Sequence, residues 1–161
     1  MKKAKPRGGG TPDAYAIREL RATDLDNGFL ETLANLSETG GLTPAAARKI
    51  LRTMKRAPLY RVFVAVGADG QVMGATTLLV EQKFIHGGGL VGHIEDVAVR
   101  KGHEGKGVGS SLVKAAVEAA QELACYKCIL DCKEELAGFY ESLGFRKHDL
   151  GMRKDLKRNS Q

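Results

Sequence analysis

The sequence of 161 residues has no long hydrophobic run. Its longest apolar stretches, such as residues 62–66 and 97–99, are far shorter than the roughly 20 residues that a membrane-spanning helix needs. The first ten residues are rich in Lys and Gly and have no apolar core of a secretory signal. Hydrophobic residues make up 43% and charged residues 27%, which is typical of a globular protein. We therefore expect a cytoplasmic protein without a membrane partner.

Cysteine is scarce, with only Cys125, Cys128 and Cys132. An odd number of cysteines in an intracellular chain argues against a disulfide framework. Cys125 and Cys128 form a C-x-x-C pair, but a zinc site needs further ligands and only His148 is near in sequence. Cys128 and Cys132 alternate with Leu130, so we expect them to be small core residues of a strand and expect no metal.

Strong positive charge is absent from the body of the chain. The net charge of +6 comes from the two ends, because residues 1–10 carry +4 and residues 153–161 carry +3. Residues 11–152 are therefore close to neutral, at −1. This distribution argues against a broad nucleic-acid-binding surface.

The hydrophobic pattern predicts one domain over residues 14–156, between a flexible basic arm at 1–13 and a short tail at 157–161. We expect helices over residues 25–36, 44–57, the segment after residue 109, and 134–143, with Thr23 or Asp24 capping the first of them. We expect strands over residues 15–20, 60–66, 71–84, 90–99, 127–132 and 145–153. This order predicts an α/β (α+β) fold with a mixed, mostly antiparallel central sheet flanked by helices.

A glycine-rich turn follows the strand at 90–99 and opens a helix. Neither known phosphate-loop pattern fits, because Val108 and Gly109 stand where a P-loop needs Lys and Ser or Thr, and the third glycine of a dinucleotide motif is missing. Glycines at a helix start still let backbone N–H groups approach an anion. The turn is either the pyrophosphate site of a coenzyme or a plain loop.

Two adjacent acids, Glu95 and Asp96, lie in the otherwise apolar strand before this turn. Neighbouring residues of a strand point to opposite faces, so we expect at least one acid near the interior. A carboxylate persists there when it is paired, or when it binds or deprotonates a ligand.

A third group of candidates follows the strand at 127–132. Asp131 lies at its carboxyl end, where open sheets of this class bind ligands. Tyr140 lies on the next expected helix, and its phenol is either a proton donor to a leaving group or a core aromatic with a satisfied hydroxyl.

Together these motifs resemble the GNAT superfamily of acetyl-CoA-dependent N-acetyltransferases, and within it the glucosamine 6-phosphate N-acetyltransferases. The segments that carry the narrower resemblance are residues 36–40, 81–86, 92–99, 125–132, 139–140 and 144–145. The resemblance covers residues 15–154 and implies the GNAT fold, with acetyl transfer from acetyl-CoA to the 2-amino group of glucosamine 6-phosphate.

The resemblance also implies roles for individual residues. Coenzyme-binding residues would be Val97, Ala98, Val99, Glu104, Gly105, Lys106, Gly107, Val108 and Gly109. Sugar-phosphate-binding residues would be Ser37, Lys83, Phe84, Ile85, His86, Glu95, Asp96, Tyr126, Lys127, Asp131 and Arg153. Catalytic residues would be Glu95 as base, Asp96 and Asp131 to orient the amine, and Tyr140 as acid. Family members are homodimers, which implies that Tyr126 and Lys127 reach the partner's sugar phosphate.

Three positions depart from the family pattern. Glu104 stands where Gln or Arg is usual, Leu136 where Asn is frequent, and Ser37 where Thr is common. We expect the Glu104 side chain to point away from the pyrophosphate while its backbone binds. Two alternatives remain: a GNAT enzyme for another amine, such as a protein N-terminus or a polyamine, and a non-catalytic coenzyme-binding module.

Overall fold

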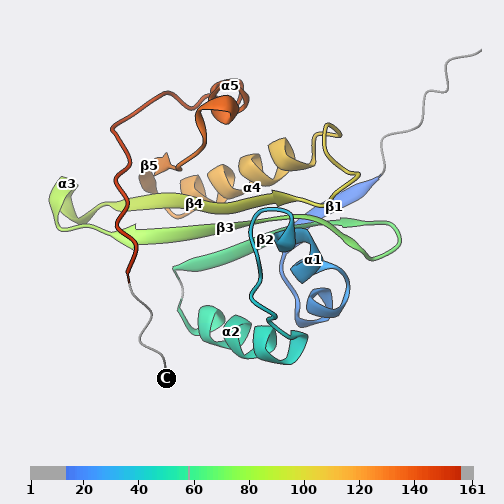
Figure 1. Cartoon of the computed structure of the whole chain (residues 1–161). Helices are drawn as coiled ribbons and strands as arrows, with labels where there is room; N and C mark the ends of the chain where they lie inside the picture. Colours follow the sequence, from blue (N-terminus) through green and yellow to red (C-terminus); the bar gives the residue numbers. More distant parts are fainter. Residues whose placement is uncertain (1–13, 58, 157–161) are drawn as a thin grey trace, which may run out of the picture. The chain divides into compact units, whose positions relative to one another are not determined.

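The computed structural model describes residues 14–57 and 59–156, which form two compact units divided after Leu130 (Figure 1). The predicted basic arm and tail lie outside the described residues, and the prediction of a single domain stays a prediction. Among the residues that the structure describes, no helix combines the length and the apolar composition needed to cross a membrane.

The first unit is built on a five-stranded sheet in the order β1-β2-β3-β4-β5. Its strands are β1 (Tyr15–Glu19), β2 (Tyr60–Gly67), β3 (Val72–Gln82), β4 (Leu90–Val99) and β5 (Cys125–Ile129). The pairs β1–β2, β2–β3 and β3–β4 are antiparallel, the last two being joined by short connections, whereas the helical crossover makes β4 and β5 parallel. The predicted mixed sheet is confirmed.

Helix α4 (Val108–Glu122) covers one face of the sheet, and its packing is tight. Its apolar side chains Leu112, Val113 and Ala116 are completely buried. A β-carbon built on Gly74 of β3 would lie 2.7 Å from Val108 Cγ1 and 2.8 Å from Leu112 Cδ1. Glycine therefore lets the helix approach the strand closely, and this fixes the start of α4 against the sheet.

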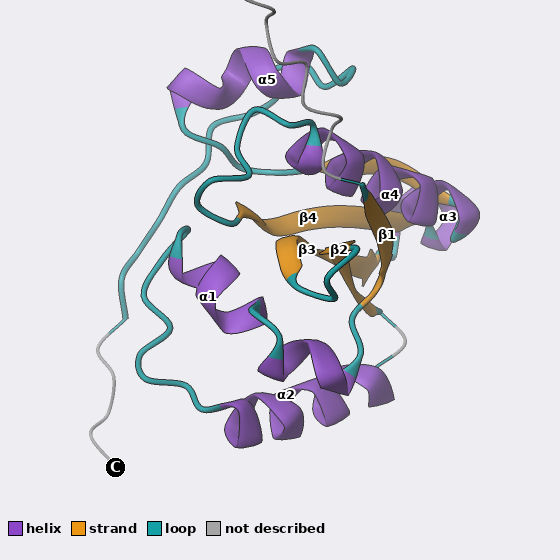
Figure 2. Ribbon diagram, turned by 90° about the vertical axis from the view of Figure 1, so that its right-hand side faces the viewer, coloured by secondary structure: helices purple, strands orange, loops and turns teal. Residues whose placement is uncertain are grey.

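Helices α1 (Phe29–Ala34) and α2 (Pro44–Arg56) cover the opposite face (Figure 2). The start of α2 is as predicted, since the Thr43 hydroxyl accepts a hydrogen bond from the Ala46 N–H and Pro44 occupies the first turn. The predicted continuous helix over 25–36 is wrong. It divides into the 3₁₀ helix η1 (Ala22–Asp26) and α1, because Gly28 adopts a left-handed φ of 93° between them.

Asp24 does not cap α1 but is buried within η1. Its burial alone would raise the pKa of this carboxyl, but hydrogen bonds from Arg18 at 2.7 and 2.8 Å and from the Arg21 N–H outweigh burial and lower it. The ion pair joins β1 to the segment that leads into α1.

The second unit, from Asp131 onward, contains the 3₁₀ helix η2 (Glu134–Leu136) and α5 (Ala137–Glu141). The helix predicted over 134–143 is thus shorter and begins with a 3₁₀ turn. Residues 145–153 form no strand, so that prediction is wrong. An isolated extended segment leaves its backbone groups unpaired unless a neighbouring strand is available.

The cysteines differ from one another in burial. Cys125 and Cys128 on β5 are partly buried, and burial raises the pKa of the Cys128 thiol to about 11, with Cys125 adding to the effect. Cys132 is exposed. Its predicted place in the core is wrong because β5 ends at Ile129, before the alternating pattern reaches it.

Candidate active site

A β-bulge lies at the two acids of β4. Thr77 pairs with Glu95 and Ala75 pairs with Ala98, so Asp96 and Val97 together oppose the single residue Thr76. Asp96 adopts a φ of 52°, which is unusual for a residue with a side chain. The Thr76 hydroxyl donates a hydrogen bond of 3.1 Å to the Glu95 carbonyl and holds the bulge from the neighbouring strand.

The bulge changes where the acids point. Alternation predicted that one of them faces the interior, but Glu95 and Asp96 are both exposed, so that prediction is wrong. The physical reason is the extra residue, which interrupts the alternation of side chains along β4. Two carboxylates are thus presented together at the surface in mid-strand.

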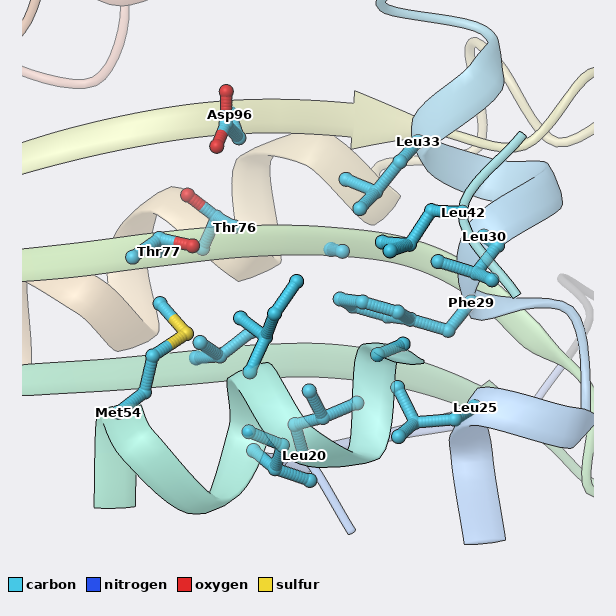
Figure 3. A pocket seen from close by; sticks show the side chains of 15 residues that line it. Leu20, Leu25, Phe29, Leu30, Leu33, Leu42, Met54, Thr76, Thr77 and Asp96 are labelled. Carbon is cyan, nitrogen blue, oxygen red and sulfur yellow. The ribbon is translucent and has the colours of Figure 1, made fainter. Parts of the chain in front are cut away.

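Asp96 also stands at the mouth of a cavity of about 170 Å³. The cavity lies between the helices α1 and α2 and the sheet, with Phe29, Leu30 and Met54 among its walls (Figure 3). Its lining is apolar except for Thr76, Thr77 and Asp96. The bulge therefore adjoins an apolar recess on one face of the sheet.

The glycine turn follows directly after β4. Gly105 and Gly107 have positive φ values of 73° and 81°, which other residues adopt only with strain, and Gly107 caps α4. The first turn of α4 is anchored, since the Ser111 hydroxyl and the Tyr15 hydroxyl lie 2.9 Å apart. The 15-residue helix presents its positive dipole end here, which suits an anionic ligand.

The Glu104 carboxylate is bound by its own loop. It accepts hydrogen bonds from the backbone N–H groups of Glu104 and Gly102, the latter at 2.6 Å, and these bonds lower the pKa of Glu104. The side chain therefore turns toward its own loop and occupies the Glu104 N–H, and the expected binding of the pyrophosphate by the Glu104 backbone stays a prediction.

The last residues of β4 connect the bulge to the loop. Ala98 and Val99 pair with Ala75 and Gly74, and the Val99 carbonyl accepts a hydrogen bond of 3.0 Å from the Asn35 side chain at the end of α1. Ser37 follows two residues later, with its N–H bonded to the Leu33 carbonyl. Ser37 is thus brought to the end of β4 that carries the acids and the loop.

Other predicted substrate residues gather at the opposite end of β4. The connection from β3 to β4 contains the short helical segment α3 (Ile85–Gly88), in which His86 and Gly87 have positive φ values of 53° and 65°. The His86 and Tyr126 rings lie 4.5 Å apart, and the Lys127 Nζ lies 5.9 Å from the Tyr126 ring centroid. Phe84 and Ile85 are exposed.

An ion-pair network at this end was not assigned a role from the sequence. Glu81 binds the Lys83 Nζ at 2.5 Å and lies 2.9 Å from the His93 Nε2, and these two partners, Lys83 first, lower the pKa of Glu81. The pairing of Glu81 with Lys83 could have been predicted from the sequence, because residues two apart on a strand lie on the same face. Lys83 is therefore held by a carboxylate on β3.

The two groups of predicted substrate residues are well separated. At about 3.3 Å per residue, the five steps from Leu90 to Glu95 span roughly 17 Å of β4. The His86 and Tyr126 rings lie beside Gly89 at the start of that span. One hexose phosphate is shorter than this, so the structure does not bring all predicted substrate residues of the first unit into one site.

The second unit carries Asp131, Tyr140 and Arg153. Tyr140 is buried, with Phe139 and Phe145 packed edge-on at centroid distances of 4.9 and 6.1 Å. Burial, with Cys132 second, raises the pKa of the Tyr140 phenol and keeps it protonated. Asp131 is exposed, and its Oδ1 would lie 3.5 Å from a β-carbon on Gly151. Arg153 is exposed and binds Asp155 at 2.6 Å.

Two further expectations concern metals and Leu136. Within residues 14–57 and 59–156, no group of three or more His, Cys, Asp or Glu side chains is placed to hold a metal ion. Leu136, which replaces the frequent Asn of the superfamily, is exposed at the start of α5.

Comparison with known proteins identifies the family. A model of the Acetyltransferase (GNAT) family matches residues 26–145. The chain is 41% identical over 136 residues to glucosamine 6-phosphate N-acetyltransferase of Candida albicans, covering 84% of this chain and 91% of that protein. It is 40% identical to glucosamine 6-phosphate N-acetyltransferase 1 of Oryza sativa subsp. japonica, covering 89% of this chain and 88% of that protein.

Solved structures agree with the sequence relatives. The crystal structure of glucosamine-6-phosphate N-acetyltransferase from Arabidopsis thaliana superposes with a TM-score of 0.87 at 29% identity, covering 89% of this chain and 99% of that chain. The predicted fold class and the predicted kind of enzyme are confirmed. The chain therefore belongs to the GNAT family of acetyltransferases, in the branch that contains the glucosamine 6-phosphate N-acetyltransferases.

Proposed function

We propose that this protein transfers an acetyl group from acetyl-CoA to the 2-amino group of glucosamine 6-phosphate. The observation that carries the proposal is the arrangement of β4, where an acidic bulge at Glu95 and Asp96 runs directly into a glycine loop at the start of α4. One strand thus places groups for handling an amine next to a site for an anionic coenzyme. The names of relatives up to 41% identical support the sugar substrate.

The residues of the first unit fit acetyl-CoA, which acetyltransferases of this family use. Val97, Ala98 and Val99 would pair with the pantetheine arm. Backbone N–H groups of the loop would hold the pyrophosphate, with these residues contributing: Gly105, Lys106, Gly107, Val108 and Gly109, and also Glu104 once its N–H is released from its own carboxylate. A β-carbon built on Gly105 would meet no atom within 4 Å, so the loop is open to a ligand there. When bound, the coenzyme supplies the thioester that carries the acetyl group.

The acids of the bulge would prepare the amine. Glu95, directly or through a water, removes a proton from the 2-ammonium group, while Asp96 and Asp131 orient the nitrogen. The nitrogen attacks the thioester carbon, and the Val97 N–H stabilises the negative charge that develops on the thioester oxygen. The C–N bond forms, the C–S bond breaks, and Tyr140 donates a proton to the departing sulfur. The raised pKa of Tyr140 keeps the phenol protonated at neutral pH, so that it carries the proton that this role needs.

The proposed sugar-phosphate contacts come from both ends of β4, which one chain does not bring into a single site. Ser37 lies at the end with the acids, and the remaining contacts would come from Lys83, Phe84, Ile85, His86, Tyr126, Lys127 and Arg153. Arg153 and Lys127 are the proposed cations for the phosphate, since a guanidinium binds phosphate oxygens bidentately.

A homodimer would explain why the two groups of proposed sugar-phosphate residues lie apart along β4. Lys127 pairs with Val91, about 13 Å along β4 from Glu95, and the Tyr126 ring lies beside Gly89, about 20 Å away, so we do not assign these side chains to the sugar of their own chain. In a dimer they would serve the partner's site. The fully exposed Phe84 and the exposed Ile85 and Tyr126 support an interface at this end of the sheet. We place this dimer in the cytoplasm, without a membrane or nucleic-acid partner.

Mixing two inactive variants tests the shared site. Glu95→Gln and Lys127→Ala are each expected to be impaired alone. After unfolding and refolding together, half of the dimers are mixed, and each mixed dimer has one intact site, so about a quarter of the parent activity returns. No recovery in mixed dimers identified by mass would contradict the shared site.

The substrate is tested by measuring free thiol released from acetyl-CoA with a panel of amines. We expect turnover with glucosamine 6-phosphate, and little with spermidine or with a peptide bearing a free N-terminus. Preference for either of those amines would assign the enzyme to another substrate class. Binding of acetyl-CoA without any turnover would favour a non-catalytic coenzyme-binding module.

A further inference from the structure

The cavity beside the bulge is not used by acetyl transfer as described above. It has a volume of about 170 Å³, and its closed end is lined by carbon side chains such as Phe29, Leu51 and Met54. The Thr76 hydroxyl is already donated to the Glu95 carbonyl. A buried water needs two to four polar partners, and an apolar cavity of about 150 Å³ stays dry and binds benzene. The chemistry of the cavity therefore suits a hydrocarbon group of a few carbons.

The mouth of the cavity indicates which hydrocarbon would enter. Asp96 lines the mouth, and Val97 is the next residue of the same bulge. In the proposed function, the Val97 N–H meets the thioester oxygen of the donor. An acyl group held there begins one residue away from Asp96, which lines the cavity. The proposed position of the reacting carbonyl thus lies next to a residue of the cavity lining.

We propose that the donor site accepts straight-chain acyl-CoA thioesters longer than acetyl-CoA, with the acyl chain entering this cavity. The proposal rests on the proposed function for the position of the thioester. By volume, the cavity takes a chain up to about six carbons. Each added methylene that is buried tightens donor binding about fourfold. The expected products are N-propionyl, N-butyryl and N-hexanoyl glucosamine 6-phosphate.

The reaction is the same acyl transfer and needs no further reactant. The amine nitrogen forms a bond to the acyl carbon, the bond from that carbon to sulfur breaks, and the amine proton leaves to Glu95. The thiolate takes up one proton and departs as coenzyme A. Only the length of the chain on the acyl carbon differs.

Filling the cavity provides the test. Ala47 of α2 is buried and lines the cavity, whereas Ala45 of the same helix is exposed. Thiol release is measured with the full chain, glucosamine 6-phosphate, and acetyl-, propionyl-, butyryl- and hexanoyl-CoA. In the parent protein, kcat/KM for butyryl-CoA is expected within about tenfold of the acetyl-CoA value, with a lower donor KM. Ala47→Leu should lower the ratio of butyryl-CoA to acetyl-CoA activity at least tenfold, and the control Ala45→Leu should leave it unchanged.

A second variant covers the case in which Ala47→Leu does not fold. Met54→Ala enlarges the same cavity and should raise the ratio of hexanoyl-CoA to acetyl-CoA activity about tenfold. The inference is overturned if the parent uses acetyl-CoA but not propionyl- or butyryl-CoA, or if both cavity variants keep the chain-length ratios of Ala45→Leu. Absence of turnover with acetyl-CoA itself would instead contradict the proposed function.

Discussion

The two faces of the sheet are packed differently, and adjacent residues of β3 show the contrast. Gly74 faces α4, where even one β-carbon would meet Val108 and Leu112 at less than 3 Å. Ala75, the next residue, lines the cavity beneath α1 and α2. The α4 face is closely packed, whereas the opposite face carries a buried hydrophobic cluster that leaves a cavity of about 170 Å³ next to the acidic bulge.

This difference in packing suits the two faces of the sheet to different roles in the proposed function. Close packing of α4 fixes the glycine loop relative to β4, and a rigid support is what a coenzyme site requires. An enclosed apolar void of about 170 Å³ would cost about 4 kcal/mol on the scale of roughly 24 cal/mol per Å³. In our proposal, the space next to the bulge receives the acyl chain of the donor.

The largest effect is expected at the bulge, where the two faces meet. Glu95→Gln removes the proposed base and should lower kcat about 10²- to 10⁴-fold. Because Glu95 is exposed, the midpoint of thermal unfolding should change little. Glu118→Gln, an exposed glutamate of α4, is the matched control and should keep full activity. Unchanged turnover in Glu95→Gln would remove that residue from the mechanism.

The next effect tests the packed face. Gly74→Ala forces a methyl group against Val108 and Leu112 and should lower the free energy of unfolding by about 1–3 kcal/mol. Gly138→Ala is the control, because its β-carbon would meet nothing within 4 Å and its helix gains from the change. Urea unfolding of both variants measures the difference. Equal stabilities would mean that the α4 face tolerates expansion as the opposite face does.

A smaller effect is expected at the loop that α4 positions. Gly107 caps the helix with a φ of 81°, and alanine in that conformation costs about 1–2 kcal/mol. Gly107→Ala should therefore weaken acetyl-CoA binding about tenfold while the KM for the sugar changes little. Isothermal titration with acetyl-CoA measures the first quantity. A change confined to the sugar KM would argue against the loop as the coenzyme site.

The smallest effect concerns Glu104. Backbone hydrogen bonds lower the pKa of this carboxyl, so it stays ionised across the neutral range. Glu104→Gln keeps the acceptor for the Gly102 N–H but removes a charge near the pyrophosphate, and should tighten acetyl-CoA binding a few-fold at low salt. The loop stabilisation from the carboxylate is present above its ordinary pKa and is lost as the pH falls through the lowered value. Weaker binding in the variant would show that the carboxylate organises the loop more than it repels the ligand.

Short sequence patterns predicted the secondary-structure elements that form the two faces. The bounds of β4 follow from its apolar pattern, the start of α2 from Thr43 and Pro44, and the start of α4 from the glycines before it. These features depend on residues close together in the chain, so the sequence is enough to place them.

Features that depend on tertiary pairing were not predictable. The bulge exists because Thr76 faces two residues of β4, and the cavity exists because α1 and α2 do not fill the space above Ala75. Gly28 was missed as the residue that divides the expected first helix. Residues 145–153 alternate like a strand, but alternation cannot supply the neighbouring strand that would pair with them.

Recognition of the sugar phosphate is central to the proposed function. The decisive measurement is kcat/KM for glucosamine 6-phosphate and for glucosamine, at saturating acetyl-CoA. We predict a preference of about 100-fold or more for the phosphorylated sugar, because charge-assisted contacts to the phosphate are worth about 1.5–3 kcal/mol each. Equal values for the two sugars would contradict the account.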